Sequence, residues 1–150
     1  MHRDMKQETK KKRPLSPEWD PWDPWYTRNV KGRYELTSVE FTVTHLCNLR
    51  CRHCAVGETL VDVEGDPLPV DRLIQRLEEV DTLKTLSITG GEPVFNPKTV
   101  KNIIQPLLRY ARDRGLYTQI NTNLTLPLSR YEEWVEDVDV LHISYNYRDA

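Results

Sequence analysis

The sequence predicts an α/β fold built on a parallel β-sheet. From residue 38 onward, short apolar and β-branched runs alternate with longer segments in which apolar residues recur at helical spacing. Strands that alternate with helices of this length are typical of βαβ units, in which a helix crosses back to begin the next parallel strand. The 150 residues are enough for one domain or for part of a larger one.

Each element has its own sequence signal. In the first helix Val70, Leu73 and Ile74 share one face. The second helix begins with a capping Asn96 and a proline at its first position, and it stops at Gly115. Pro106 lies inside that helix and should kink it. We expect strands at residues 38–44, 85–89, 116–121 and 138–145, and helices at residues 70–82, 97–114 and 128–136.

Two segments precede the predicted sheet. Residues 1–13 hold six basic and two acidic side chains, which leaves 15 basic and 21 acidic ones in the rest of the chain. We interpret residues 1–18 as a disordered basic tail. Nucleic-acid binding is the less favoured alternative, because no aromatic or glycine residue interrupts the basic run. Residues 19–37 form a Trp/Pro-rich lead-in, which we expect to pack on the outside of the domain rather than to dock a partner.

The composition of the chain indicates in which cellular compartment the protein is expected. The first thirteen residues are polar and carry no apolar core of the kind found in a signal peptide. No apolar run approaches the length of a membrane span. The three cysteines are grouped rather than spread as a disulfide framework, which indicates a reducing cytosol. We therefore expect a cytoplasmic protein without a membrane partner.

The three cysteines, Cys47, Cys51 and Cys54, form a C-x3-C-x2-C pattern directly after the first predicted strand. Three thiolates in a loop can converge on one inorganic centre, and they are one short of the four that normally hold a [4Fe–4S] cluster. One iron would then be open to another ligand. A zinc site completed by His45 or His53 is the alternative, and a disulfide pair is a weaker one because the cysteine count is odd. Arg50 and Arg52 can tune the potential of such a centre, but we expect them simply to face solvent.

A second motif extends the pattern. Gly90-Gly91-Glu92-Pro93 ends the second predicted strand, and Gly90 follows Cys54 by 36 residues. The two motifs in this order resemble the radical S-adenosylmethionine (radical SAM) superfamily over residues 38–150. The resemblance implies a partial parallel (β/α) barrel of the radical SAM type, with about four of its six β/α units in this chain. Residues 38–150 would then be the N-terminal part of the radical SAM core, ending before the fifth strand.

The resemblance also implies which residues bind the cofactors. Cys47, Cys51 and Cys54 would hold the cluster, and Gly90, Gly91 and Glu92 would receive the amino group of SAM. Glycine would let the backbone approach the ligand closely, although the motif can also be an ordinary turn. The resemblance also implies that His53 contacts SAM, at a position where relatives have an aromatic residue beside the adenine. It implies ribose-side contacts at Asn121 and Asn123, although these residues can instead simply cap the strand end. Ser144 is implied as a further contact, but its neighbours depart from the Ser-x-Asp-Gly of many relatives.

The function implied by this resemblance is reductive cleavage of SAM to a 5′-deoxyadenosyl radical, with electrons from a donor such as flavodoxin or ferredoxin. The sequence around Cys51–Gly57 and the Asp-Pro-Trp repeats resemble the bacterial YfkAB-type proteins, in which a second half with further cysteines follows the radical SAM half. We therefore expect a C-terminal half to be required, in cis or in trans. The alternatives are a catalytically inactive iron–sulfur subunit, a zinc-binding interaction module, or a gene fragment.

Overall fold

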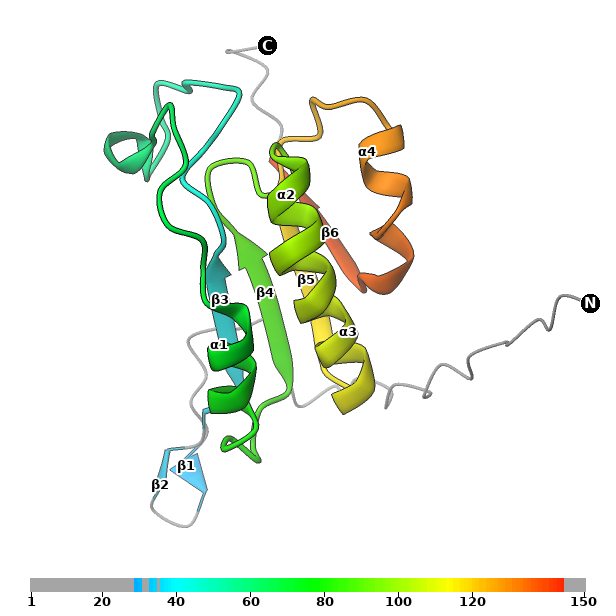
Figure 1. Cartoon of the computed structure of the whole chain (residues 1–150). Helices are drawn as coiled ribbons and strands as arrows, with labels where there is room; N and C mark the ends of the chain where they lie inside the picture. Colours follow the sequence, from blue (N-terminus) through cyan, green and yellow to red (C-terminus); the bar gives the residue numbers. More distant parts are fainter. Residues whose placement is uncertain (1–28, 31–32, 35, 145–150) are drawn as a thin grey trace, which may run out of the picture.

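Four parallel strands form the sheet at the centre of the structure, a computed structural model that describes residues 29–30, 33–34 and 36–144. The strands are β3 (Ser38–Thr42), β4 (Thr85–Thr89), β5 (Tyr117–Thr122) and β6 (Val140–Ile143), and they lie in that order across the sheet. Every neighbouring pair is parallel. The predicted α/β class with a parallel sheet is confirmed, and the sheet is open rather than closed into a barrel (Figure 1).

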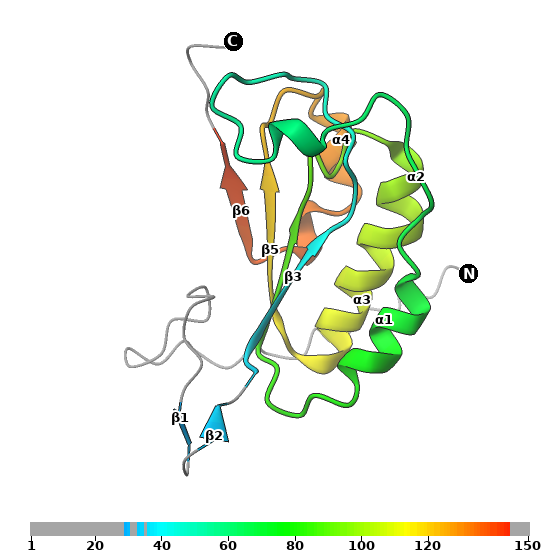
Figure 2. The same cartoon turned by 90° about the vertical axis from the view of Figure 1, so that its left-hand side faces the viewer.

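All helices of this unit cover the same face of the sheet (Figure 2). They are α1 (Val70–Leu77), α2 (Pro97–Thr99), α3 (Gln105–Arg114) and α4 (Ser129–Glu132), with the 3-10 turn η3 (Val135–Asp137) and a π-helical segment η2 (Val100–Ile104). The 3-10 turn η1 (Gly57–Thr59) lies instead in the connection between Cys54 and α1. The predicted helix at residues 70–82 is too long, because α1 ends at Leu77. The predicted helix at residues 128–136 is likewise split, into α4 and η3.

Pro106 is accommodated by the π-helical segment that precedes it. A proline in a regular helix clashes with the carbonyl group four residues earlier. Here the backbone widens before the proline, and the Gln105 amide donates to the Val100 carbonyl five residues back. One extra residue in the turn is a common way for a helix to absorb such a defect. The helix then continues to Arg114 and ends at Gly115, the predicted stop, which adopts the left-handed conformation with φ of 75°.

The two faces of the sheet differ in chemistry. On the helix side, Phe41, Ile88 and Ile120 stand in register on neighbouring strands and belong to one buried apolar core. On the other side, the register row of Glu40, Ser87 and Gln119 is polar. Ser87 donates to the Glu40 carboxylate there at 3.3 Å. The alternation fixes which side chains of each strand face the helices.

The N-terminal predictions fall mostly outside the described residues. This holds for the basic tail at residues 1–18 and for the Asp-Pro-Trp repeats. Within the lead-in, the structure describes a short antiparallel pair, β1 (Asn29–Val30) and β2 (Arg33–Tyr34). Among the described residues, no helix combines the length and the apolar composition needed to cross a membrane.

Candidate functional site

The carboxyl ends of all four parallel strands meet at one edge of the sheet, and a pocket of about 310 Å³ lies there. Ligands of open parallel sheets gather at this edge because the loops that follow the strands converge on it. Nine of the ten predicted site residues line the pocket, and Glu92 is the exception. The nine are Cys47, Cys51, Cys54, His53, Gly90, Gly91, Asn121, Asn123 and Ser144.

The cysteine loop, residues 47–54, begins shortly after β3. Strand β3 ends at Thr42 rather than at the predicted residue 44, although the Val43 amide still bonds to the Thr89 carbonyl at 2.9 Å. The loop is closed by turns in which the Cys54 amide donates to the Cys51 carbonyl and the Gly57 amide to the Cys54 carbonyl, both at 3.2 Å. At its base, Leu46 forms an isolated parallel bridge with Val61.

None of these three described cysteines forms a disulfide, and all three are half-buried. Within residues 36–144, no three Cys, His, Asp or Glu side chains already form a group that could hold a metal ion. The donor set nevertheless fits an iron–sulfur cluster. Three thiols from one loop line one pocket, which is what three-thiolate ligation of a cluster requires. That Cys47, Cys51 and Cys54 hold a cluster stays a prediction.

Burial raises the pKa of the Cys47 thiol, and the nearby Glu92 and Cys51 act in the same direction. The Leu49 amide, which donates to the Cys47 sulfur at 3.4 Å, and the charge of Arg50 oppose this shift. The thiol is thus favoured over the thiolate in the metal-free protein. Because only the thiolate binds metal, ligation at Cys47 must release a proton.

Gly90 and Gly91 pack against the start of the cysteine loop. A Cβ at Gly90 would lie 2.6 Å from the Thr44 carbonyl oxygen. A Cβ at Gly91 would overlap the Leu46 carbonyl group and lie 3.0 Å from the Cys47 Cβ. These contacts give a reason for the glycines that the sequence did not supply, and the close approach of SAM to their backbone stays a prediction. Among the described glycines only Gly115 has a positive φ, and the space that a Cβ would need belongs to the protein backbone.

Glu92 does not line the pocket and is only 1% exposed. Its two carboxylate oxygens accept from the Thr122 hydroxyl at 2.6 Å and from the Asn123 amide at 2.7 Å. Its own amide donates to the Leu46 carbonyl at 2.8 Å. Burial raises the pKa of this carboxyl, and the hydrogen bonds partly counteract the shift. Glu92 thus joins the end of β5 to the cysteine loop, and its carboxylate does not line the pocket in which we expect SAM.

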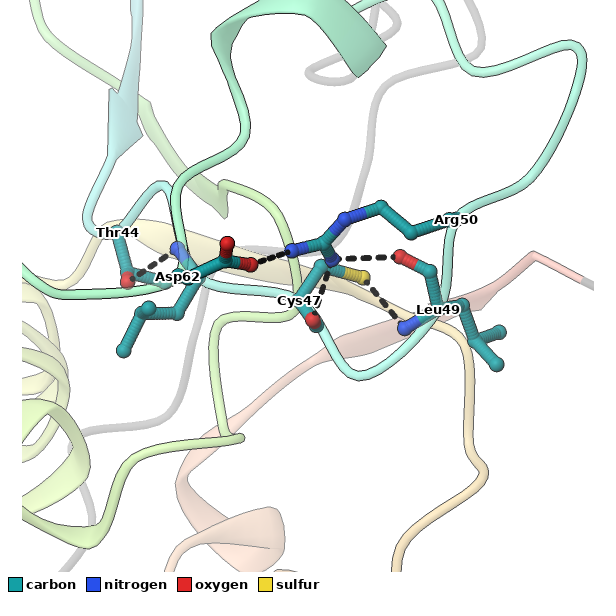
Figure 3. Close-up of polar contacts among 6 residues, drawn as sticks. Thr44, Cys47, Leu49, Arg50 and Asp62 are labelled. Carbon is teal, nitrogen blue, oxygen red and sulfur yellow. Dashed lines mark hydrogen bonds and ion pairs between the residues drawn. The ribbon is translucent and has the colours of Figure 1, made fainter.

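Arg50 is not simply solvent-facing, as the sequence led us to expect. Figure 3 shows its guanidinium group folded back over the cysteine loop. One nitrogen donates to the Cys47 carbonyl at 2.7 Å and to the Leu49 carbonyl at 3.0 Å. The other nitrogen bonds to Asp62 at 2.8 Å. Arg52, in the same loop, is exposed.

The end of β5 carries the two asparagines that we predicted on the ribose side. Asn121 lines the pocket, and its side-chain oxygen accepts from Gln119 at 2.9 Å. Asn123 also lines the pocket, but its side chain is engaged by the protein. Its oxygen accepts from the amide and hydroxyl of Thr125, and its nitrogen donates to Asn48 at 3.0 Å. These contacts favour the alternative in which Asn123 shapes the strand end.

The residue after Asn123 has unusual backbone geometry. Leu124 has a φ of 52°, and it is the only non-glycine residue with positive φ in the part of the chain that the structure describes. Left-handed backbone of this kind costs a side-chain-bearing residue about 1–2 kcal/mol.

At Leu124 we expect the glycine variant to be more stable than the alanine variant, which is the reverse of the usual order. Leu124→Gly should be about 1 kcal/mol more stable than Leu124→Ala, because only glycine adopts positive φ without strain. Leu128 is a matched control, since it is 71% exposed and has a φ of −55°. There glycine should bring no such gain over alanine, because the backbone is in the right-handed region and carries no strain to relieve. Urea unfolding of the four variants measures both differences, and the same ranking at both positions would contradict the strain.

Ser144 and His53 complete the predicted set. The Ser144 amide donates to the Thr122 carbonyl at 2.9 Å, which extends the pairing of β5 and β6 by one residue. His53 and Ser144 are both exposed and line the pocket. Their contacts with SAM stay predictions. Sequence reasoning missed four other lining residues: Leu49, Ala55, Thr89 and Thr122. Thr89 and Thr122 end strands β4 and β5, so their positions at the strand ends were a usable signal.

Comparison with known proteins agrees with this arrangement. The sequence model of the Radical SAM superfamily matches residues 41–148, which cover the cysteine loop and the ends of all four parallel strands. The chain therefore belongs to the radical SAM superfamily.

Individual relatives are longer than this chain. It is 52% identical over 137 residues to the putative protein YfkA of Bacillus subtilis, and the match covers 91% of this chain and 37% of that protein. It is 26% identical over 113 residues to a PqqA peptide cyclase of Bradyrhizobium diazoefficiens, covering 74% and 28%. It is 33% identical over 101 residues to a 7-carboxy-7-deazaguanine synthase of Methanopyrus kandleri, covering 54% and 38%. The chain thus spans well under half of the length of each of these relatives.

Proposed function

We propose that this chain binds a [4Fe–4S] cluster through Cys47, Cys51 and Cys54 and takes part in the reductive cleavage of SAM. The observation that carries the proposal is the pocket at the carboxyl ends of the strands. The three cysteine side chains line it together with the predicted SAM-binding residues at the ends of β4, β5 and β6. Two similar proteins are named as enzymes, a peptide cyclase and a synthase, which supports a catalytic role.

In this proposal, different residues of the chain bind the cluster and SAM. The three cysteines hold the cluster and leave one iron without a protein ligand. The backbone of Gly90 and Gly91, the side chain of Asn121 and the hydroxyl of Ser144 contact SAM, and His53 stacks beside its adenine. When bound, the cluster supplies the electron that cleaves SAM to a 5′-deoxyadenosyl radical. The chain orients the two cofactors and excludes water from one side of them.

The complete reaction requires more than these residues in our proposal. The described sheet has four strands and is open, and the longer relatives hold additional chain. We propose that a further segment, in cis or as a second chain, completes the barrel and shapes the substrate site. A flavodoxin or ferredoxin supplies electrons, and a reducing cytosol keeps the cysteines from forming disulfides.

Anaerobic reconstitution tests the proposal. We expect about four iron and four sulfide per chain, with loss of the cluster in air. Cys47→Ala, Cys51→Ala and Cys54→Ala should each abolish binding, whereas an Arg52→Ala change in the same loop should not. Cleavage of SAM under dithionite, with the completing segment present, then separates an enzyme from an inactive iron–sulfur subunit. Stoichiometric zinc in place of iron would contradict the proposal.

A further inference from the structure

Two side chains brace the first half of the cysteine loop, and the proposed function assigns a role to neither. The first is Asn48, which follows Cys47 directly. Its side-chain nitrogen donates to the Thr125 hydroxyl at 2.7 Å, and its oxygen accepts from the Asn123 side chain at 3.0 Å. Asn48 therefore ties the loop to the turn that follows β5, the turn that contains the strained Leu124.

The second brace is Arg50. Its guanidinium group bonds to the carbonyl of Cys47 and, through its other nitrogen, to the carboxylate of Asp62 (Figure 3). An isolated exposed ion pair contributes little, but here the same group also binds two loop carbonyls. Asn48 and Arg50 thus tie the segment around Cys47 to two separate parts of the chain, at residues 123–125 and at residue 62.

We propose that Asn48 and Arg50 are positioning residues, which hold Cys47 in place before the cluster arrives. This inference rests on the proposed function of Cys47 as a cluster ligand. A ligand that is already fixed loses less conformational freedom when the cluster binds. The turn of Cys51–Cys54 is formed by bonds within the loop and does not use these two side chains for its backbone bonds. The braces should therefore act on Cys47 selectively.

The metal-free protein allows a test that needs no cluster. The chain has only three cysteines, so Cys51→Ser/Cys54→Ser leaves Cys47 as its sole thiol, and Cys47→Ser/Cys51→Ser leaves Cys54. The rate of reaction with a disulfide reagent is then measured across pH. The limiting rate at high pH reports access to the thiol, separately from its pKa.

We expect Asn48→Ala and Arg50→Lys each to raise the limiting rate of Cys47 by about threefold to tenfold, as the loss of one or two hydrogen bonds implies. Lysine keeps the positive charge, so the effect reports the lost bonds. Thr125→Val should act like Asn48→Ala, although it lies outside the loop, and the two together should add little. Arg52→Lys is the matched control in the loop and should change nothing.

The behaviour of Cys54 distinguishes positioning from general loosening. If the two side chains position Cys47, the reaction rate of Cys54 is unchanged in these variants. If their loss loosens the whole loop, the reaction rates of both thiols rise equally, and the proposal is overturned. An unchanged rate at Cys47 in both Asn48→Ala and Arg50→Lys overturns it as well. In reconstituted protein, the same variants should lose iron to a chelator faster. If no cluster forms at all, the proposed function fails, and the thiol measurement still decides the bracing.

Discussion

Gly91→Val should strongly reduce cluster binding rather than merely weaken the binding of SAM. The added Cβ overlaps the Leu46 carbonyl group and crowds Cys47, so the start of the cysteine loop has to move. Overpacking of this kind costs about 1–3 kcal/mol in well-packed sites, and each 1.4 kcal/mol is tenfold in an equilibrium. We expect cluster occupancy after anaerobic reconstitution to fall about tenfold or more. Iron and sulfide analysis measures the loss.

Gly65→Ala is the matched control for this prediction. Gly65 lies in the long connection between the cysteine loop and α1, and a Cβ there meets no atom within 4 Å. The cluster occupancy of the Gly65→Ala protein should equal that of the unmodified chain. A Gly91→Val protein that keeps a full cluster and loses only its response to SAM would restore the original interpretation, in which the glycines serve the ligand.

Glu92→Ala should be the most destabilising single change at the site. It removes the acceptor for the buried Thr122 hydroxyl and for the half-buried Asn123 amide. We expect a loss of about 3 kcal/mol in the free energy of unfolding, measured in urea on the metal-free protein. A double-mutant cycle of Glu92→Gln with Thr122→Val isolates the first of these bonds. Glu58→Ala, at an exposed residue of η1, should cost little.

Glu92 also predicts a pH dependence of definite sign. Its pKa is raised in the folded state, chiefly by burial, so the folded protein holds this proton more tightly than the unfolded chain does. The resulting contribution to stability is fully present below the ordinary carboxyl pKa of about 4.3 and is lost as pH rises through the raised value. Glu92→Gln should remove this decline. An identical pH profile in both proteins would show that Glu92 titrates alike in the folded and unfolded states.

The order and type of the elements could be read from the sequence, because both follow from local patterns. Strand β4 has the predicted bounds, and the other strand boundaries differ by a few residues. Asn96 caps the second helix through the Lys98 amide, and Gly115 ends it, both as predicted. The π-helical turn before Pro106 was not predictable. It lets the backbone avoid a clash with Pro106 while the apolar face of the helix still packs on the sheet.

The sequence by itself determined the chemistry of the site: three cysteines at a family-specific spacing and a Gly-Gly-Glu-Pro turn, each after a strand. Parallel topology then implied that these residues meet at one edge of the sheet. Only the tertiary structure decided how they are supported. The contact of Gly91 with Leu46 and the bonds of Glu92 to Thr122 and of Asn48 to Thr125 join residues 20 or more positions apart. Such contacts depend on the relative placement of whole strands, which no local pattern in the sequence encodes.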